Sequence, residues 1–106
     1  MQLGKVVGTV VSTRKVESIE GLKLLSVREI NLANGKEKDN YIVAVDAVQA
    51  GVGDIVLYAT GSAARQTLQT LNKPADAVIM AIVDICEVGG KVIFRKESIA
   101  EKEVPL

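Results

Sequence analysis

The fold of this chain is decided by the stretch Tyr41-Ile-Val-Ala-Val-Asp46-Ala-Val-Gln-Ala50-Gly-Val-Gly-Asp54-Ile-Val-Leu-Tyr58. It contains two short apolar runs, at 41–45 and 54–59, joined by a segment rich in glycine. Short β-branched runs bounded by turn residues are typical of strands. The stretch therefore predicts two strands connected by a turn, with Asp46 and Asp54 at its two ends.

Further segments on both sides of this stretch also have the composition of strands. They are residues 3–13, 22–32, 77–86 and 91–96. Val and Ile are abundant in them, and β-branched side chains pack well on a pleated surface. Gly4 and Gly8 interrupt the first segment, where glycine marks a bulge, a barrel corner or a close backbone approach. We expect 77–86, the most hydrophobic strand, to be central and 91–96 to be an edge strand.

Turns and one helix are predicted between these strands. Asn34-Gly35 predicts a type I′ hairpin turn, because both residues tolerate positive φ angles. Apolar residues recur at i, i+4 and i+7 over 63–71, which predicts a short amphipathic helix. Ser62 is a suitable N-cap for it, and Pro74 lies just beyond its end.

Five or six short strands and one small helix indicate a mainly β fold, an antiparallel barrel that is closed or partly open. An OB-like barrel is the obvious candidate at this size, and a two-sheet sandwich is the main alternative. A chain of 106 residues is expected to form one domain. We assign the barrel to residues 1–96 and a charged C-terminal tail to 97–106.

The charge and apolar content of the chain narrow its possible partners. Thirteen basic residues balance thirteen acidic ones, so the chain lacks the positive excess that attracts nucleic acids or anionic membranes. Hydrophobic residues make up 48% of the chain, and there are nine glycines besides. The two groups together exceed the roughly 45–50% that apolar residues and glycine usually contribute to globular domains. We expect part of this surplus to be buried between subunits. A start unlike a signal peptide and the lack of a long apolar run predict a cytoplasmic protein.

Catalytic chemistry has few candidate residues. The chain has no His, which excludes a Ser-His-Asp triad, a Cys-His pair and an imidazole metal site. The single Cys86 is interpreted as a buried structural thiol, with a reactive or redox role as the alternative. Asp46, Asp54 and Asp84 could act as paired carboxylates or hold a hard cation, but Asp46 and Asp54 are expected to cap the turn between them. The sequence thus predicts no enzyme, no metal site and no cofactor.

The polar segment Thr60-Gly61-Ser62-Ala63-Ala64-Arg65 has three possible roles. Free N–H groups at a helix start, with a hydroxyl and an Arg nearby, can hold an anion. The segment can also be a plain helix cap or a contact between subunits. An OB barrel raises one further alternative, which is binding of single-stranded nucleic acid, although the neutral charge and the 3% of aromatic residues argue against it.

Five segments in order resemble the EutN/CcmL family, the small vertex proteins of bacterial microcompartment shells. They are Gly4-Lys-Val-Val-Gly-Thr-Val-Val-Ser-Thr-Arg-Lys15, Gly21-Leu-Lys-Leu-Leu25, Val43-Ala-Val-Asp46, Ala50-Gly-Val-Gly-Asp54 and Gly61-Ser-Ala-Ala-Arg-Gln-Thr67. The resemblance extends from Met1 to about Phe94. Ala63 stands where the family commonly has a second Ser, and Gln49 where Gly is common, which affects pore polarity or turn shape.

The resemblance implies a five-stranded OB-like barrel that assembles into a cyclic homopentamer. Such pentamers form the vertices of a polyhedral shell whose facets are hexameric tiles of another fold, so hexameric shell proteins are implied as partners and the shell as the location. The site residues implied near the five-fold axis are Gly61, Ser62, Ala63, Ala64 and Arg65. No catalysis, cofactor, nucleic acid or membrane is implied.

Overall fold

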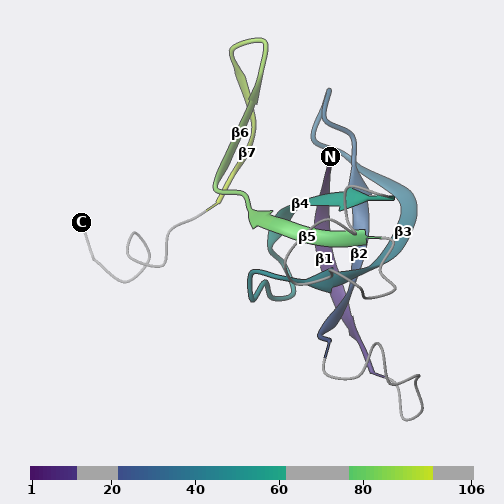
Figure 1. The fold of residues 1–106 in the computed structure, drawn as a ribbon. Coiled ribbons are helices and arrows are strands. Elements are labelled where there is room, and N and C mark those ends of the chain that lie inside the picture. The colour runs from purple at the N-terminus through teal and green to yellow at the C-terminus, as the bar shows by residue number, and fades with distance from the viewer. Residues whose placement is uncertain (12–21, 62–76, 97–106) are drawn as a thin grey trace.

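A computed structural model describes residues 1–11, 22–61 and 77–96, which form a closed barrel and a separate hairpin (Figure 1). The strands are β1 (Gln2–Val10), β2 (Leu24–Ile30), β3 (Glu37–Asp46), β4 (Ile55–Thr60), β5 (Ala77–Ile82), β6 (Ile85–Val88) and β7 (Lys91–Arg95). The first five strands close the barrel in the order β1-β2-β3-β5-β4, and β6 pairs with β7 alone. The predicted small five-stranded barrel is confirmed.

Every neighbouring pair in the barrel is antiparallel except β3 and β5, which run parallel. The sequence predicted an antiparallel barrel, and the parallel pairing of β3 with β5 was not expected from it. The described residues contain no helix, and so none that is long and apolar enough to cross a membrane. The predicted helix over 63–71 and the tail at 97–106 lie outside the described residues.

The two glycines of β1 lie where neighbouring strands approach closely. A Cβ atom on Gly4 would lie 2.5 Å from Cγ1 of Val27 and 2.9 Å from Cε1 of Tyr58. A Cβ atom on Gly8 would lie 2.8 Å from the hydroxyl of Ser26, and the register of β1 against β2 shifts between Val6 and Gly8. The predicted bulge and close approach in this strand are therefore confirmed.

The single strand predicted over 77–86 is wrong, because the chain bends at Val83 and Asp84. β5 ends at Ile82 and is one of the strands that form the barrel, whereas β6 starts a hairpin that is not part of the barrel. The Val83 N–H donates to the carbonyl of Ile55 at 2.7 Å, which satisfies the backbone at the bend. Both halves are apolar for different reasons, because β5 is a strand of the wall with Ile79 in the inner cluster and Val78 in an outer one, whereas Cys86 of β6 packs against the wall from outside. The edge strand predicted over 91–96 corresponds to β7, which pairs with β6 along one edge only.

The turn after β2 is not the predicted type I′ turn, since among its residues only Gly35 has a positive φ, at 73°. The carbonyl of Asn31 accepts the Gly35 N–H at 2.7 Å, and its side-chain oxygen accepts the Ala33 N–H at 2.8 Å. Asn34 instead accepts the Lys36 N–H at 2.8 Å. The side chains of both asparagines thus form local hydrogen bonds that compete with the tighter turn.

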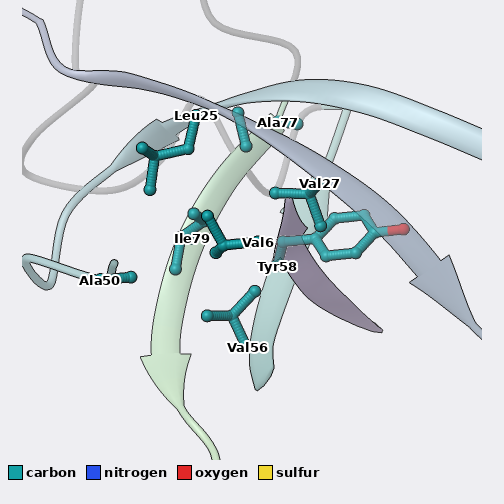
Figure 2. Close-up of a cluster of buried hydrophobic side chains, with 9 residues drawn as sticks. Val6, Leu25, Val27, Ala50, Val56, Tyr58, Ala77 and Ile79 are labelled. Atoms are coloured by element: carbon teal, nitrogen blue, oxygen red, sulfur yellow. The ribbon is translucent and has the colours of Figure 1, made fainter. Parts of the chain in front are cut away.

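Apolar side chains pack both inside the barrel and against its outer wall. The inner cluster, drawn in Figure 2, includes Val6, Leu25, Val27, Ala44, Val56, Tyr58 and Ile79. One outer cluster consists of Val45, Ala59 and Val78. The other is built on Leu3, Ile30 and Ile55, and Cys86 and Phe94 of the hairpin pack against it. The wall is therefore buried on both faces over much of its area.

Tyr58 is the largest side chain of the inner cluster, and its buried hydroxyl has no hydrogen-bond partner among the residues that the structure describes. Burial raises the pKa of Tyr58 above its ordinary value near 10, and the negative charge of Glu29 raises the pKa further. A buried polar atom with no partner costs about 1–3 kcal/mol. The ring fills the barrel, while its hydroxyl lowers the stability of the fold.

Replacing Tyr58 by Phe is expected to raise the free energy of unfolding by about 1 kcal/mol at neutral pH. Because the folded pKa is raised, the folded state holds the phenol proton more tightly, and this contribution to stability is lost as pH rises above about 10. The variant should therefore lose less stability than the parent protein above that pH. Urea unfolding at equal protein concentration measures both effects.

The variant Tyr41→Phe, which removes an exposed hydroxyl, is the matched control. An equal gain in the free energy of unfolding in both variants would contradict the destabilising role of the Tyr58 hydroxyl. So would a loss of stability above pH 10 in Tyr58→Phe that equals the loss in the parent protein.

Candidate functional site

Asp46 organises the turn between β3 and β4. Its side chain is 1% exposed, and one carboxylate oxygen accepts the N–H groups of Val48 at 3.0 Å and Ala50 at 3.2 Å. The ammonium of Lys23 lies 3.3 Å from the other oxygen and donates to the carbonyl of Ala50 at 3.1 Å. The predicted turn-capping role of Asp46 is confirmed, and Lys23 is a partner that the sequence analysis missed.

Asp54 closes the same turn from its other end. Its carboxylate accepts the Gly51 N–H at 2.9 Å, and its own N–H donates to the Gly51 carbonyl at 3.0 Å. The Gly53 N–H donates to the Val6 carbonyl at 2.8 Å, and the Val6 N–H donates to the Asp54 carbonyl at 2.9 Å. The turn is thus fastened to β1, and the predicted capping role of Asp54 is confirmed as well.

Gln49 holds the turn in an unusual backbone conformation. Its φ is 60°, the only positive φ of a non-glycine residue in the described ranges. Glycine adopts this region at no steric cost, whereas other L-residues are strained there. The glycine that the family commonly has at this position would fit the same conformation. Gln49 therefore leaves the turn shape compatible with the family and adds local strain.

The remaining chemical candidates do not come together. Asp84 is exposed at the bend before β6, and Cys86 is a free, half-buried thiol packed against the outer wall. Across residues 1–11, 22–61 and 77–96, no three Cys, Asp or Glu side chains are close enough to hold a metal ion. Asp46 and Asp54 serve the turn between β3 and β4, and Cys86 serves packing.

Of the five predicted assembly residues, the structure describes only Gly61. It follows β4, is exposed, and has a φ of 64°, with no atom within 4 Å of the position that a Cβ atom would occupy. Ser62, Ala63, Ala64 and Arg65 lie outside the described residues. Thr60 pairs with Ala77, so the chain leaves the barrel beside the point where it re-enters.

The described surface carries large apolar side chains that no prediction singled out. On the barrel, Tyr41 is 57% and Val43 is 52% exposed, both on β3. On the hairpin, Ile85, Val88 and Val92 are exposed. The signal for the first pair was already in the sequence, because 41–45 is apolar at both odd and even positions, as expected of a strand with neither face in water.

Comparison with known proteins gives the chain a set of close relatives. Residues 1–84 match the family described as ethanolamine utilisation protein EutN/carboxysome. The carboxysome shell vertex protein CcmL of Gloeobacter violaceus is 41% identical over 97 residues, which cover 92% of this chain and 96% of that protein. The microcompartment shell vertex protein GrpN of Rhodospirillum rubrum is 44% identical over 90 residues, covering 82% of this chain and 97% of that protein.

Solved structures agree with these sequence matches. The structure of Gloeobacter violaceus CcmL has a TM-score of 0.85 at 41% identity, covering 91% of this chain and 98% of that one. The structure of Rhodospirillum rubrum GrpN, described as a pentameric microcompartment shell protein, has a TM-score of 0.73 at 44% identity and covers 83% of this chain and 100% of that one. The family match over residues 1–84 thus includes all five strands of the barrel.

Replacing Asp46 by Ala is expected to lower the free energy of unfolding by about 2–4 kcal/mol, because two N–H groups lose their acceptor and the Lys23 ammonium loses its ion-pair partner. The matched control is Asp46→Asn, whose amide oxygen can still accept both N–H groups, while the negative charge and the ion pair with Lys23 are lost. Its loss should be clearly smaller. Urea unfolding measures both, and equal losses would contradict the capping role.

Proposed function

The chain belongs to the EutN/CcmL family of microcompartment shell vertex proteins, and we propose that five copies form a ring that caps a vertex of a polyhedral shell. The observation that carries this proposal is the match over the entire barrel to relatives named as shell vertex proteins, one of them solved as a pentamer. The protein is accordingly a structural component of the shell in the bacterial cytoplasm.

The chemistry of the described residues supports an assembly role over catalysis or nucleic-acid binding. The chain has no His, and Asp46 and Asp54 are committed to backbone hydrogen bonds. Its net charge is zero, whereas binding of single strands relies on a basic groove and stacking aromatic rings. The exposed Tyr41 is already stacked under Arg28, 5.3 Å from the ring centre. We therefore propose that the protein has a role in assembly and no enzymatic activity.

The segment from Gly61 to Arg65 is proposed to line the five-fold axis of the ring, as the family resemblance implies. Gly61 supports this proposal because its positive φ turns the chain out of β4 at one end of the barrel. A loop that starts in a fixed direction at the barrel end is suited to meet its copies around an axis. Ser62, Ala63, Ala64 and Arg65 would then contribute the contacts at the axis.

Replacing Gly61 by Val is expected to lower the yield of pentamer, because a β-branched residue is strained at a φ of 64° even where space is open. Asn tolerates this conformation, so Gly61→Asn should assemble like the parent protein, which is expected to be a pentamer. Native mass spectrometry at micromolar concentration measures the species. A monomeric parent protein would contradict the ring itself, and equal assembly of both variants would contradict the role of Gly61.

We also propose hexameric shell proteins as edge-on partners. A flat lattice of hexagonal tiles cannot close without five-fold defects, so a pentamer with matching edges converts a sheet into a closed body. Each edge contact is expected to be small, nearer the roughly 1,200 Å² of transient interfaces than the size of obligate ones. The shell would then be held by many edges that engage together.

Co-expression with hexameric shell proteins from the same genome tests this partnership. We expect closed polyhedra by electron microscopy when this chain is present, and sheets, tubes or open bodies when it is absent. The Gly61→Val variant is the matched control, because it retains the chain and lowers only the amount of pentamer. Equally well-closed shells without this protein in them would contradict the vertex role.

A further inference from the structure

A cleft lies between the β6–β7 hairpin and the outer wall of the barrel, and we call it the hairpin cleft. Leu3, Ile30 and Ile55 line it from the barrel, and Ile93 and Phe94 line it from β7. The cleft has a volume of about 250 Å³, which several water molecules would fill, since each takes about 30 Å³ in the liquid. Water against such apolar walls finds few hydrogen-bond partners, so the cleft is suited to an apolar side chain.

Backbone contacts set the width of the hairpin cleft. A Cβ atom on Gly35, in the turn after β2, would lie only 2.9 Å from the carbonyl oxygen of Ile93, so this turn touches β7 closely. At the base of the hairpin, the Lys96 N–H donates to the carbonyl of Asp84 at 2.6 Å. Because the backbones already touch at Gly35, β7 cannot move closer to the barrel there and close the cleft.

The rim of the cleft carries a lysine whose charge is only weakly paired. The Lys5 ammonium lies 4.0 Å from the Glu37 carboxylate, which is too long for a hydrogen bond. The same carboxylate lies nearer to Arg28, at 3.5 Å. Within residues 1–11, 22–61 and 77–96, no other acidic side chain lies within ion-pair distance of Lys5. The rim can therefore accept a second carboxylate beside Lys5.

The last described residue, Lys96, lies at the mouth of this cleft. Its ammonium is 3.7 Å from the carboxylate of Asp54, and Asp54 follows Gly53, which lines the cleft. Ile99 comes three residues after Lys96, and three extended residues span at most about 10 Å. The first large apolar side chain after the described part of the chain is thus within reach of the cleft.

The segment 97–101 also has the charges that suit the rim. Glu97, Ile99 and Glu101 stand at alternate positions of the sequence. In an extended chain every second side chain points to the same side. An extended segment that directs Ile99 into the cleft therefore directs a carboxylate to the rim on each side of it, where one of them can pair with Lys5.

We propose that the segment 97–101 folds back into the hairpin cleft of its own chain, with Ile99 between the barrel and β7 and Glu101 beside Lys5. The segment then acts as a strap that fastens the hairpin to the barrel. A two-stranded hairpin is at most marginally stable in water on its own, and the strap adds packing at its base. This role goes beyond the proposed vertex function and requires no neighbouring copy.

Thiol crosslinking within one chain tests this contact. In a Cys86→Ser background, the chain carries Glu37→Cys at the rim together with Ile99→Cys, and it is treated with a short bismaleimide. We expect one linker to join the two thiols of the same chain, as measured by mass spectrometry of the digested protein. The matched control replaces Glu37→Cys by Lys91→Cys, at an exposed position by the turn end of the same hairpin, and should give far less linked product.

Two results of this experiment would overturn the proposed contact. Equal yields from the 37/99 and 91/99 pairs would show that the segment has no preferred place. A linked dimer from co-expression of the two single variants, Glu37→Cys and Ile99→Cys, would place the segment on a neighbouring copy instead of its own chain.

Cleavage by trypsin after Lys96 provides a second and independent measurement. Ile99→Ser is expected to raise the rate of this cleavage by about tenfold or more, because cleavage follows the population of the undocked segment. Val104→Ser, which lies outside the strap, should leave the rate unchanged. An intact pentamer that shows neither the 37/99 link nor an effect of Ile99→Ser overturns this inference and leaves the proposed function standing. A protein that shows both effects but forms no pentamer overturns only the proposed function.

Discussion

Closure of the barrel between β3 and β5 is the contact on which the rest of the structure depends. Two residue pairs form it, Val45↔Val78 and Asp46↔Ile79, and parallel pairing is slightly weaker per residue than antiparallel pairing. Asp46 strengthens this short junction, because the residue that pairs with β5 also caps the following turn and binds Lys23 of the β2 side. Without closure, β3 and β5 would each expose an unpaired edge.

The features that the sequence predicted are those encoded by neighbouring residues. The turn that contains Asp46 and Asp54 could be predicted, because each carboxylate accepts hydrogen bonds from backbone N–H groups a few positions away. The parallel pairing of β3 with β5 and the break at Asp84 depend on contacts far apart in sequence, and an apolar run does not encode a change of direction. The Asn34-Gly35 turn was predicted wrongly because the side chain of Asn31, three residues before Asn34, forms a competing bond.

Of the five residues predicted for the candidate site, the structure describes only Gly61. Gly61 fits a turn that needs a positive φ, and the structure has one there. The exposed surface on β3 was visible only as an apolar residue at every position from Ile42 to Val45, which does not tell which face meets water and which meets a partner. The separate β6–β7 hairpin could not be foreseen, because the bend between β5 and β6 lies within an apolar run that looks like one strand.

Apolar residues are distributed unevenly over the outer wall of the barrel. The β6–β7 hairpin covers one part of the outer wall, over Leu3, Ile30 and Ile55, whereas the outward-facing Tyr41 and Val43 of β3 remain exposed. A single self-complementary surface would stop at a two-fold dimer, but two different surfaces on opposite sides propagate head to tail until the rotation closes. A small barrel whose outer wall is covered in one part and exposed in another offers two different surfaces, as a closed ring requires.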